Sequence, residues 1–96
     1  MSALIAMREA LQNPAEFQRY TMIYYRALVM DMLSDPRYHQ HRTALFGAIR
    51  TITEWQRNGS DEFVAFYTDY VTVTKIVDDV MIAVDQQALD ILEAQP

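Results

Sequence analysis

The chain has 96 residues, of which 51% are hydrophobic, and carries a formal net charge of −5. This length allows one folded domain, residues 1–96, with a small core. The absence of cysteine excludes a disulfide framework and a thiolate metal site and favours the cytoplasm. No apolar run approaches the ~20 residues that a membrane span needs, and the excess of acids disfavours binding to nucleic-acid phosphates.

Few residues in this chain break secondary structure, since it has only two glycines and three prolines. That favours a few long helices over many short strands. Asn13 and Asp35 each precede a proline and are predicted N-caps, while Gly59 and Ser60 separate one helix from the next. The chain is therefore predicted to be all-α, a bundle of three long helices plus a short N-terminal helix. The expected helices cover residues 2–12, 14–34, 36–58 and 61–94.

The predicted helix over 14–34 is apolar around nearly its whole circumference. A helix of this kind is normally buried on every side, which three or four helices in one small chain do not achieve. It is therefore either the central helix or presents one face to its neighbours and another to a partner. Tyr20, Tyr24 and Tyr25 favour the partner, because phenol rings combine a large apolar contact area with a polar end.

The predicted helix over 36–58 holds the two histidines of the chain. His39 and His41 are two residues apart and point to different sides of a helix, whereas metal-binding histidines on one face are four apart. No metal site and no cofactor is expected here. Further along, Ala44, Gly47 and Ala48 form a patch of small residues that predicts a close crossing with another helix.

The stretch YVTVTKIV, residues 70–77, is rich in β-branched residues and could be a strand. As a strand it would have no cleanly apolar face. As a helix it belongs to an apolar register, spaced alternately three and four residues, that we call the seam. We favour the helix because this register outweighs local propensity, with a kink near 71–76 as the alternative. The seam comprises Phe63, Phe66, Tyr70, Val73, Val77, Val80 and Val84.

The last predicted helix is long for so small a chain. A helix of ~34 residues spans ~50 Å, whereas a compact domain of this size is ~32 Å across. The helix then either breaks and folds back, or carries part of its apolar surface beyond its own globule. A second copy is the simplest cover, because most oligomers are symmetric homomers. We therefore expect a homodimer packed through this helix, in parallel or antiparallel orientation.

Charge is distributed unevenly along the chain. Residues 1–57 hold seven arginines and five acids, whereas residues 58–96 hold one lysine and eight acids. Arg19 and Arg26 are seven apart, as are Arg50 and Arg57, so each pair lies along one helix face. We expect salt links to the last helix or to its dimer mate, with an anion-binding strip as the alternative. A solvated stripe, rather than a divalent-ion or acid–base site, is expected from Asp78, Asp79, Asp85 and Glu93.

No nucleotide-binding, metalloprotease or nucleophile-elbow motif occurs, and no catalytic residue is predicted. The expected function is non-enzymatic: a small regulatory or adaptor protein acting by protein–protein interaction, such as an inhibitor, anti-activator or chaperone-like subunit of a phage or bacterium. The alternative is a small dimeric helical enzyme that binds an anionic substrate with arginines between its subunits. The predicted interface comprises Tyr20, Tyr24, Tyr25 and the seven residues of the seam.

Overall fold

The computed structural model describes residues 14–58 and 62–95, which form helices and contain no strand. The predicted all-α class is confirmed, and the helix predicted over 14–34 matches the observed one. The helix expected over 2–12, and the caps expected at Asn13, Gly59 and Ser60, lie outside the described residues. In chain order the elements are α2 (Pro14–Ser34), the 3-10 helix η1 (Pro36–His41), α3 (Arg42–Asn58) and α4 (Phe63–Glu93).

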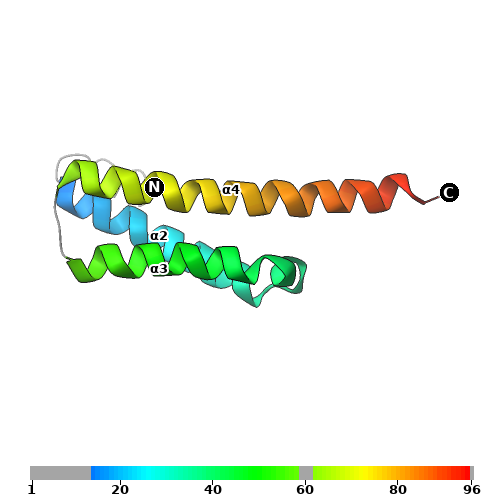
Figure 1. Cartoon of the computed structure of the whole chain (residues 1–96), viewed down its shortest axis with the longest axis horizontal. Helices are drawn as coiled ribbons and strands as arrows, with labels where there is room; N and C mark the ends of the chain where they lie inside the picture. Colours follow the sequence, from blue (N-terminus) through cyan, green and yellow to red (C-terminus); the bar gives the residue numbers. More distant parts are fainter. Residues whose placement is uncertain (1–13, 59–61, 96) are drawn as a thin grey trace, which may run out of the picture.

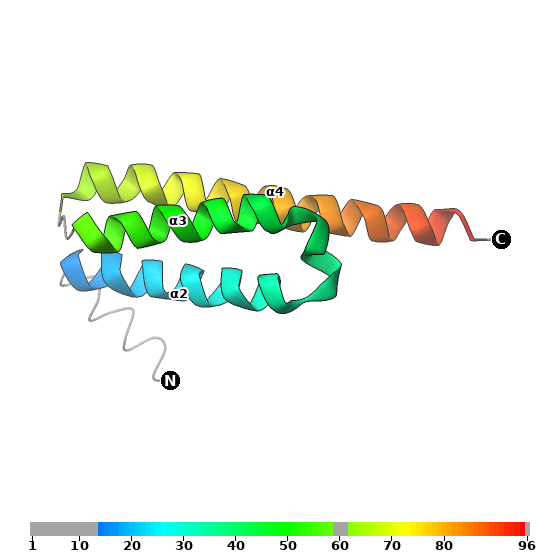
Figure 2. The same ribbon diagram turned by 60° about the horizontal axis from the view of Figure 1, so that its bottom comes forward.

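The three α-helices lie side by side, with α2 and α3 joined through η1 at one end (Figures 1 and 2). Helix α4 runs alongside both and then continues past them toward its C-terminus (Figure 1). The molecule is therefore elongated, with a longest dimension of 54 Å and a radius of gyration of 16.0 Å. A compact chain of this length would have a radius of gyration of ~12.5 Å. No helix in the described ranges combines the length and apolar character that crossing a membrane would require.

The connection between α2 and α3 corrects one prediction. The segment 36–41, expected as the first turns of an α-helix, is a 3-10 helix. Its N-cap is Asp35, as predicted, whose carboxylate accepts a hydrogen bond from the Arg37 N–H at 3.0 Å. The Tyr38 N–H donates to the Asp35 carbonyl three residues back, also at 3.0 Å. This tighter spacing fits a short connector that must bring α3 back along α2 while Tyr38 packs on the core.

Helix α4 is continuous through the stretch of β-formers. Its 31 residues include the whole of 70–77, so neither a strand nor a break occurs there. The threonine hydroxyls in and before this stretch donate to carbonyls of the preceding turn, as Thr72 does to Thr68 at 3.1 Å and Thr74 to Val71 at 3.1 Å. The helix therefore gives these hydroxyls hydrogen-bond partners while Val73 and Val77 are buried in the core, which is why the apolar register prevails over strand propensity.

The core lies where the three helices face one another. Helix α4 contributes one face of valines and Phe66, and α3 contributes a matching stripe centred on Ile52. Helix α2 covers both with Met22, Val29 and Met32, which are seven and three residues apart. The buried apolar residues of this core are Met22, Val29, Met32, Leu45, Ala48, Ile52, Trp55, Phe66, Val73, Val77 and Val80.

Two polar atoms are buried in or beside this core with no hydrogen-bond partner among the described residues. They are Oε1 of Gln18, a residue only 2% exposed, and Nε1 of Trp55. An unpaired buried polar group costs ~1–3 kcal/mol relative to a hydrogen-bonded one. Gln18 therefore lowers the stability of the fold, and an apolar side chain at position 18 would remove its share of this penalty.

The small-residue patch does not form a close helix crossing, which corrects the prediction made for Gly47. A Cβ added at Gly47 would meet no atom of another residue within 4 Å, excluding its own helix backbone and chain neighbours. Ala48 is fully buried, whereas Ala44 is exposed. Only Ala48 of the three therefore faces the core, because the core face of α3 is a single stripe with a period of 3.6 residues.

Candidate functional site

The part of the seam from Phe66 to Val84 is covered mainly by the chain's own helices. Phe66, Val73, Val77, Val80 and Val84 are buried, and the first four belong to the core built with α2 and α3. Burial by the chain's own helices accounts for these positions without a partner. Their assignment to an interface between molecules stays a prediction.

Three further residues of the predicted interface, Phe63, Tyr70 and Tyr25, belong to an aromatic cluster at the α2–α4 contact. Tyr25 packs edge-on against Tyr70, with ring centroids 5.8 Å apart, and Tyr70 stacks on Phe66 at 5.7 Å. Burial, followed by the neighbouring Tyr70, raises the pKa of Tyr25 above its ordinary value. Phe63 lies at the exposed end of this cluster, 61% exposed, and stacks on Tyr67. The cluster is mainly structural, with an open edge at Phe63.

Helix α2 carries a second apolar surface that faces solvent, as the sequence predicted for a helix apolar all round. Tyr20 and Tyr24, both predicted interface residues, are half exposed. Ile23 and Tyr24 follow Tyr20 by three and four residues, and Met30 follows Ile23 by seven, so the members share one helix face. We call this set the outer α2 stripe; it comprises Tyr20, Ile23, Tyr24 and Met30.

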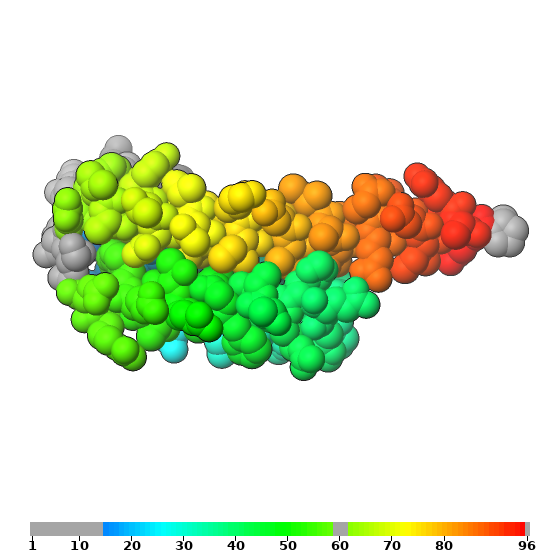
Figure 3. All heavy atoms as spheres, in the orientation of Figure 1, coloured from blue at the N-terminus to red at the C-terminus, as the bar shows by residue number. Residues whose placement is uncertain are grey.

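The end of α4 forms a further apolar surface. Val84 is the last buried residue, and every residue from 85 to 95 is exposed. We call residues 85–95 the C-terminal overhang; they project past the rest of the molecule in the space-filling view of Figure 3. Leu89, Ile91 and Leu92 are between 50% and 64% exposed on it. Large apolar side chains on an isolated helix are what a partner surface covers in most proteins.

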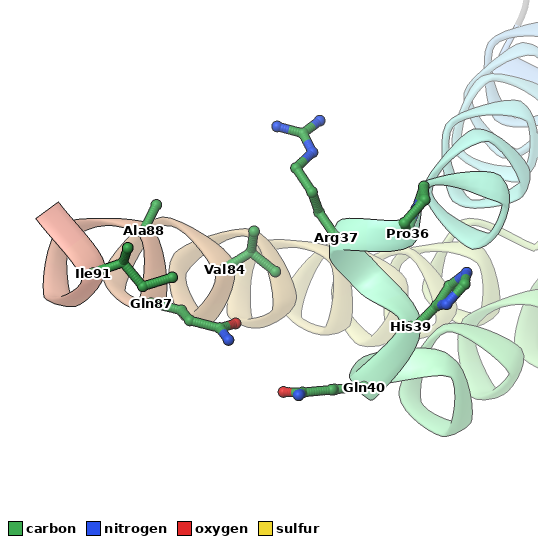
Figure 4. A pocket seen from close by; sticks show the side chains of 8 residues that line it. All are labelled: Pro36, Arg37, His39, Gln40, Val84, Gln87, Ala88 and Ile91. Carbon is green, nitrogen blue, oxygen red and sulfur yellow. The ribbon is translucent and has the colours of Figure 1, made fainter.

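A cleft of about 440 Å³ opens between η1 and the start of the overhang. Its α4 wall continues the register of the seam, because Val84 is followed by positions three, four and seven residues further on. In Figure 4, Gln40 extends from η1 toward the overhang, whereas Arg37 points away from the space between the two elements. The cleft is lined by Pro36, Arg37, His39, Gln40, Val84, Gln87, Ala88 and Ile91.

The charge at this cleft comes from Arg37. Its guanidinium forms a two-pronged ion pair with the Asp35 carboxylate, with Nη2 to Oδ2 at 2.7 Å. This hydrogen bonding lowers the pKa of Asp35 and raises that of Arg37, to which the charge of Asp85 on α4 also contributes. The charge of Arg37 is therefore balanced chiefly by Asp35, with a smaller contribution from Asp85.

The salt links predicted for the other arginines are not formed within the described chain. Arg19, Arg26, Arg50 and Arg57 are exposed, and the ion pairs recorded between described residues are Arg37–Asp35 and Lys75–Asp79. The core contacts of α4 with α2 and α3 are apolar, so the acids of α4 lie outside the core. The acids predicted to form a solvated stripe, Asp78, Asp79, Asp85 and Glu93, are indeed exposed.

Nothing in the described ranges resembles a built catalytic or metal site. No group of three or more His, Asp or Glu side chains there is arranged to hold a metal ion. The arginines do not converge, and the one arginine that lines the cleft is already paired with Asp35.

The cleft residues were missed as a set by sequence reasoning. The signal for its α4 wall was present, since Ala88 and Ile91 extend the seam register and only Gln87 interrupts it. The η1 wall had no such signal, because it depends on the 3-10 helix, which places Pro36 and His39 at the cleft beside α4.

Comparison of the chain with models of protein families, with curated proteins and with solved structures finds no match.

Proposed function

We propose that this chain is a small non-enzymatic regulatory or adaptor protein that acts as a homodimer by protein–protein interaction. An inhibitor, an anti-activator or a chaperone-like subunit of a phage or bacterium would fit. The carrying observation is the C-terminal overhang, where eleven consecutive residues are exposed and three of them are large and apolar. A cytoplasmic location is part of the proposal, supported by the cysteine-free composition.

The two apolar surfaces support two different contacts. The overhang, beyond the three-helix core, is the surface we assign to the second copy. The outer α2 stripe, with Tyr20 and Tyr24, is the surface we assign to a different protein. Tyrosine and methionine are enriched at such surfaces, because they supply apolar area and adapt to a partner's shape.

The size of the overhang sets the strength of the proposed dimer. Leu89 and Leu92 are three residues apart and share one face of α4, whereas Ile91, two residues after Leu89, points to a different side. The two leucines are about half exposed, so burying the rest of each is worth ~1 kcal/mol, and four such side chains in a symmetric dimer give ~4 kcal/mol. Association costs ~4–15 kcal/mol in lost translational and rotational freedom. The leucine contact therefore supports a weak dimer, and we expect it to dissociate on dilution.

Analytical ultracentrifugation over a wide range of protein concentrations tests the dimer. We expect the mass to rise with concentration toward twice the 11.2 kDa of the chain. Leu89→Ser together with Leu92→Ser should hold the protein as a monomer with unchanged helix content, because both residues are exposed. A wild-type protein that stays monomeric at every concentration would remove the dimer from the proposal.

The heterologous contact is tested by quantitative affinity capture from the native host. The wild type is compared with a Tyr20→Ser, Tyr24→Ser variant, and an exposed substitution on another helix, Thr43→Ser, serves as the control. A specific partner should be lost with the tyrosine variant and kept with the control. Recovery of this chain alone, or of the same proteins with all three baits, would contradict a role for the outer α2 stripe.

The enzyme alternative gains no comparable support. It requires several arginines around one concavity, and the cleft has only Arg37, held by Asp35.

A further inference from the structure

We propose that residues 2–12 of this chain pack as a helix on an aromatic face that α2 and α4 present on the side away from α3. The inference goes beyond the proposed function, and it is independent of the dimer, because the overhang lies at the opposite end of α4 (Figure 1). We call this surface the aromatic face; it comprises Phe17, Tyr24, Phe63 and Tyr67.

The aromatic face is continuous and partly exposed. Phe17 of α2 packs edge-on against Phe66 of α4, with ring centroids 6.5 Å apart, and Phe63 contacts the same ring at 6.2 Å. Tyr67 stacks on Phe63 at 5.9 Å. The side chains of Phe63, Tyr67 and Tyr24 are between 53% and 61% exposed. Large apolar side chains gathered on one surface of a small domain mark a contact that another element covers.

This face lies on the side of α2 and α4 that α3 leaves open. Tyr25 of α2 and Tyr70 of α4 meet across the contact between the two helices, with ring centroids 5.8 Å apart. Tyr67 precedes Tyr70 by three residues, which turns it about 60° further from the buried valines of α4. Tyr24 precedes Tyr25 by one residue and is likewise turned away from the core. Among the described residues no helix covers this side, since both outer tyrosines are more than half exposed.

Residues 2–12 are attached beside this face. They precede α2, which begins at Pro14, and Phe17 of the aromatic face follows three residues later. Helices α2 and α4 begin at the same end of the molecule (Figures 1 and 2). A helix that turns back before Pro14 runs antiparallel to both. Residues 2–12 as a helix would rise ~16 Å, which reaches from the start of α2 to the level of Tyr24.

The sequence of this segment supplies a matching apolar face. Leu4, Met7 and Leu11 are three and four residues apart, so they share one side of a helix, and most polar residues of the segment lie on the other sides. The antiparallel direction places Leu11 beside Phe63 and Met7 beside Tyr67. A methionine thioether packs favourably against aromatic rings.

The assignment divides the apolar surface of α2 between two contacts. The aromatic face becomes an internal contact of the chain, whereas Tyr20, Ile23 and Met30 of the outer α2 stripe stay open to a partner. Tyr24 borders both surfaces.

Disulfide cross-linking in the full chain tests the placement, because the chain has no native cysteine. Met7→Cys combined with Tyr67→Cys should form a disulfide within one molecule in dilute solution. Met7→Cys combined with Gln56→Cys is the matched control, since Gln56 is exposed on α3, which lies on the other side of the α2–α4 pair. Cysteines join without strain only when their Cα atoms are within ~7 Å. We expect the first pair to form its disulfide about tenfold faster than the control.

Each alternative occupant gives a different result. Equal rates for the two pairs, or no disulfide in either, would overturn the placement. A disulfide that joins two chains at positions 7 and 67 would assign the aromatic face to the N-terminal segment of a second copy, and would overturn an internal contact. None of these variants alters the leucines of the overhang, so the proposed dimer is judged separately by its mass.

A double-mutant cycle tests the contact by a second measurement. Leu11→Ala and Phe63→Ala should be coupled, because residues in contact do not have additive effects on stability. In urea unfolding, the change in the equilibrium constant for the pair should differ about threefold or more from the product of the single changes. Leu11→Ala with Phe46→Ala, an exposed position on α3, should agree with that product within about twofold. Additive effects in both pairs would contradict the contact between Leu11 and Phe63.

Discussion

Val77→Asp probes the packing of α4 directly. Val77 is 2% exposed in the middle of the helix and faces α2 and α3. The change removes ~1.5–3 kcal/mol of apolar burial and adds several kcal/mol for an unpaired buried carboxylate. The total, ~5 kcal/mol or more, is comparable with the lower part of the ~5–15 kcal/mol that holds a domain together, where a chain with so small a core is expected to lie. We therefore expect Val77→Asp to unfold the monomer, beyond any effect on a dimer.

Far-UV circular dichroism with urea titration measures the outcome. Val77→Asp should lose most of its helical signal at 25 °C, and the milder Val77→Ala should cost roughly 2 kcal/mol with the helix content kept. Asp79→Asn is the control two residues on: it loses an exposed pair with Lys75, 3.0 Å long, and should cost under ~0.5 kcal/mol. If Val77→Asp melts with the wild-type midpoint, α4 does not pack against α2 and α3 through its seam.

Three further substitutions test single features of the fold by thermal and urea unfolding. Gly47→Ala should stabilise the protein by ~0.5–1 kcal/mol, because it adds helix propensity where a Cβ meets open space; a loss of stability would reveal a neighbour at that site. Gln18→Met should stabilise by ~1 kcal/mol by removing the unpaired buried Oε1, and a lower midpoint would indicate a hidden partner for that amide. Burial, then the charge of Glu54, raises the pKa of Asp69, so the folded state binds this proton more tightly than the unfolded chain does. Asp69→Asn should therefore be the more stable protein at pH 7, by under ~1 kcal/mol, with the gap closing as the pH falls through the folded pKa toward the unfolded value of ~3.9. An unchanged gap between pH 7 and pH 4 would contradict this.

Sequence patterns were reliable where one residue type has one structural use. Pro14 and Pro36 follow residues suited to N-caps; α2 begins at Pro14 as predicted, and a helical segment begins at Pro36, although its first six residues are 3-10 rather than α. The seam identified α4, because a register of seven positions has a single helical explanation.

The patterns were a poor guide where the outcome depends on which residues of a neighbouring helix lie opposite. Gly47 suggested a close crossing, yet it faces open space, since a small residue alone does not say which side of a helix is covered. The spacing of Arg19 and Arg26 suggested salt links to the last helix or to its dimer mate; no acid within the described chain pairs with them, and a link to a dimer mate stays a prediction. Arginines that share one face of a helix do not show on which side a neighbouring helix carries its acids.

The amino-acid order alone determined that this chain is helical and that its last helix carries one long apolar register, while a kink near 71–76 stayed open. These are local properties of periodicity and length. Only the tertiary packing decided where the coverage stops, at Val84, and that a 3-10 turn at Pro36–His41 opens a cleft against the helix beyond it. Coverage depends on the relative lengths and offsets of three helices, and those are set by how the core side chains interlock.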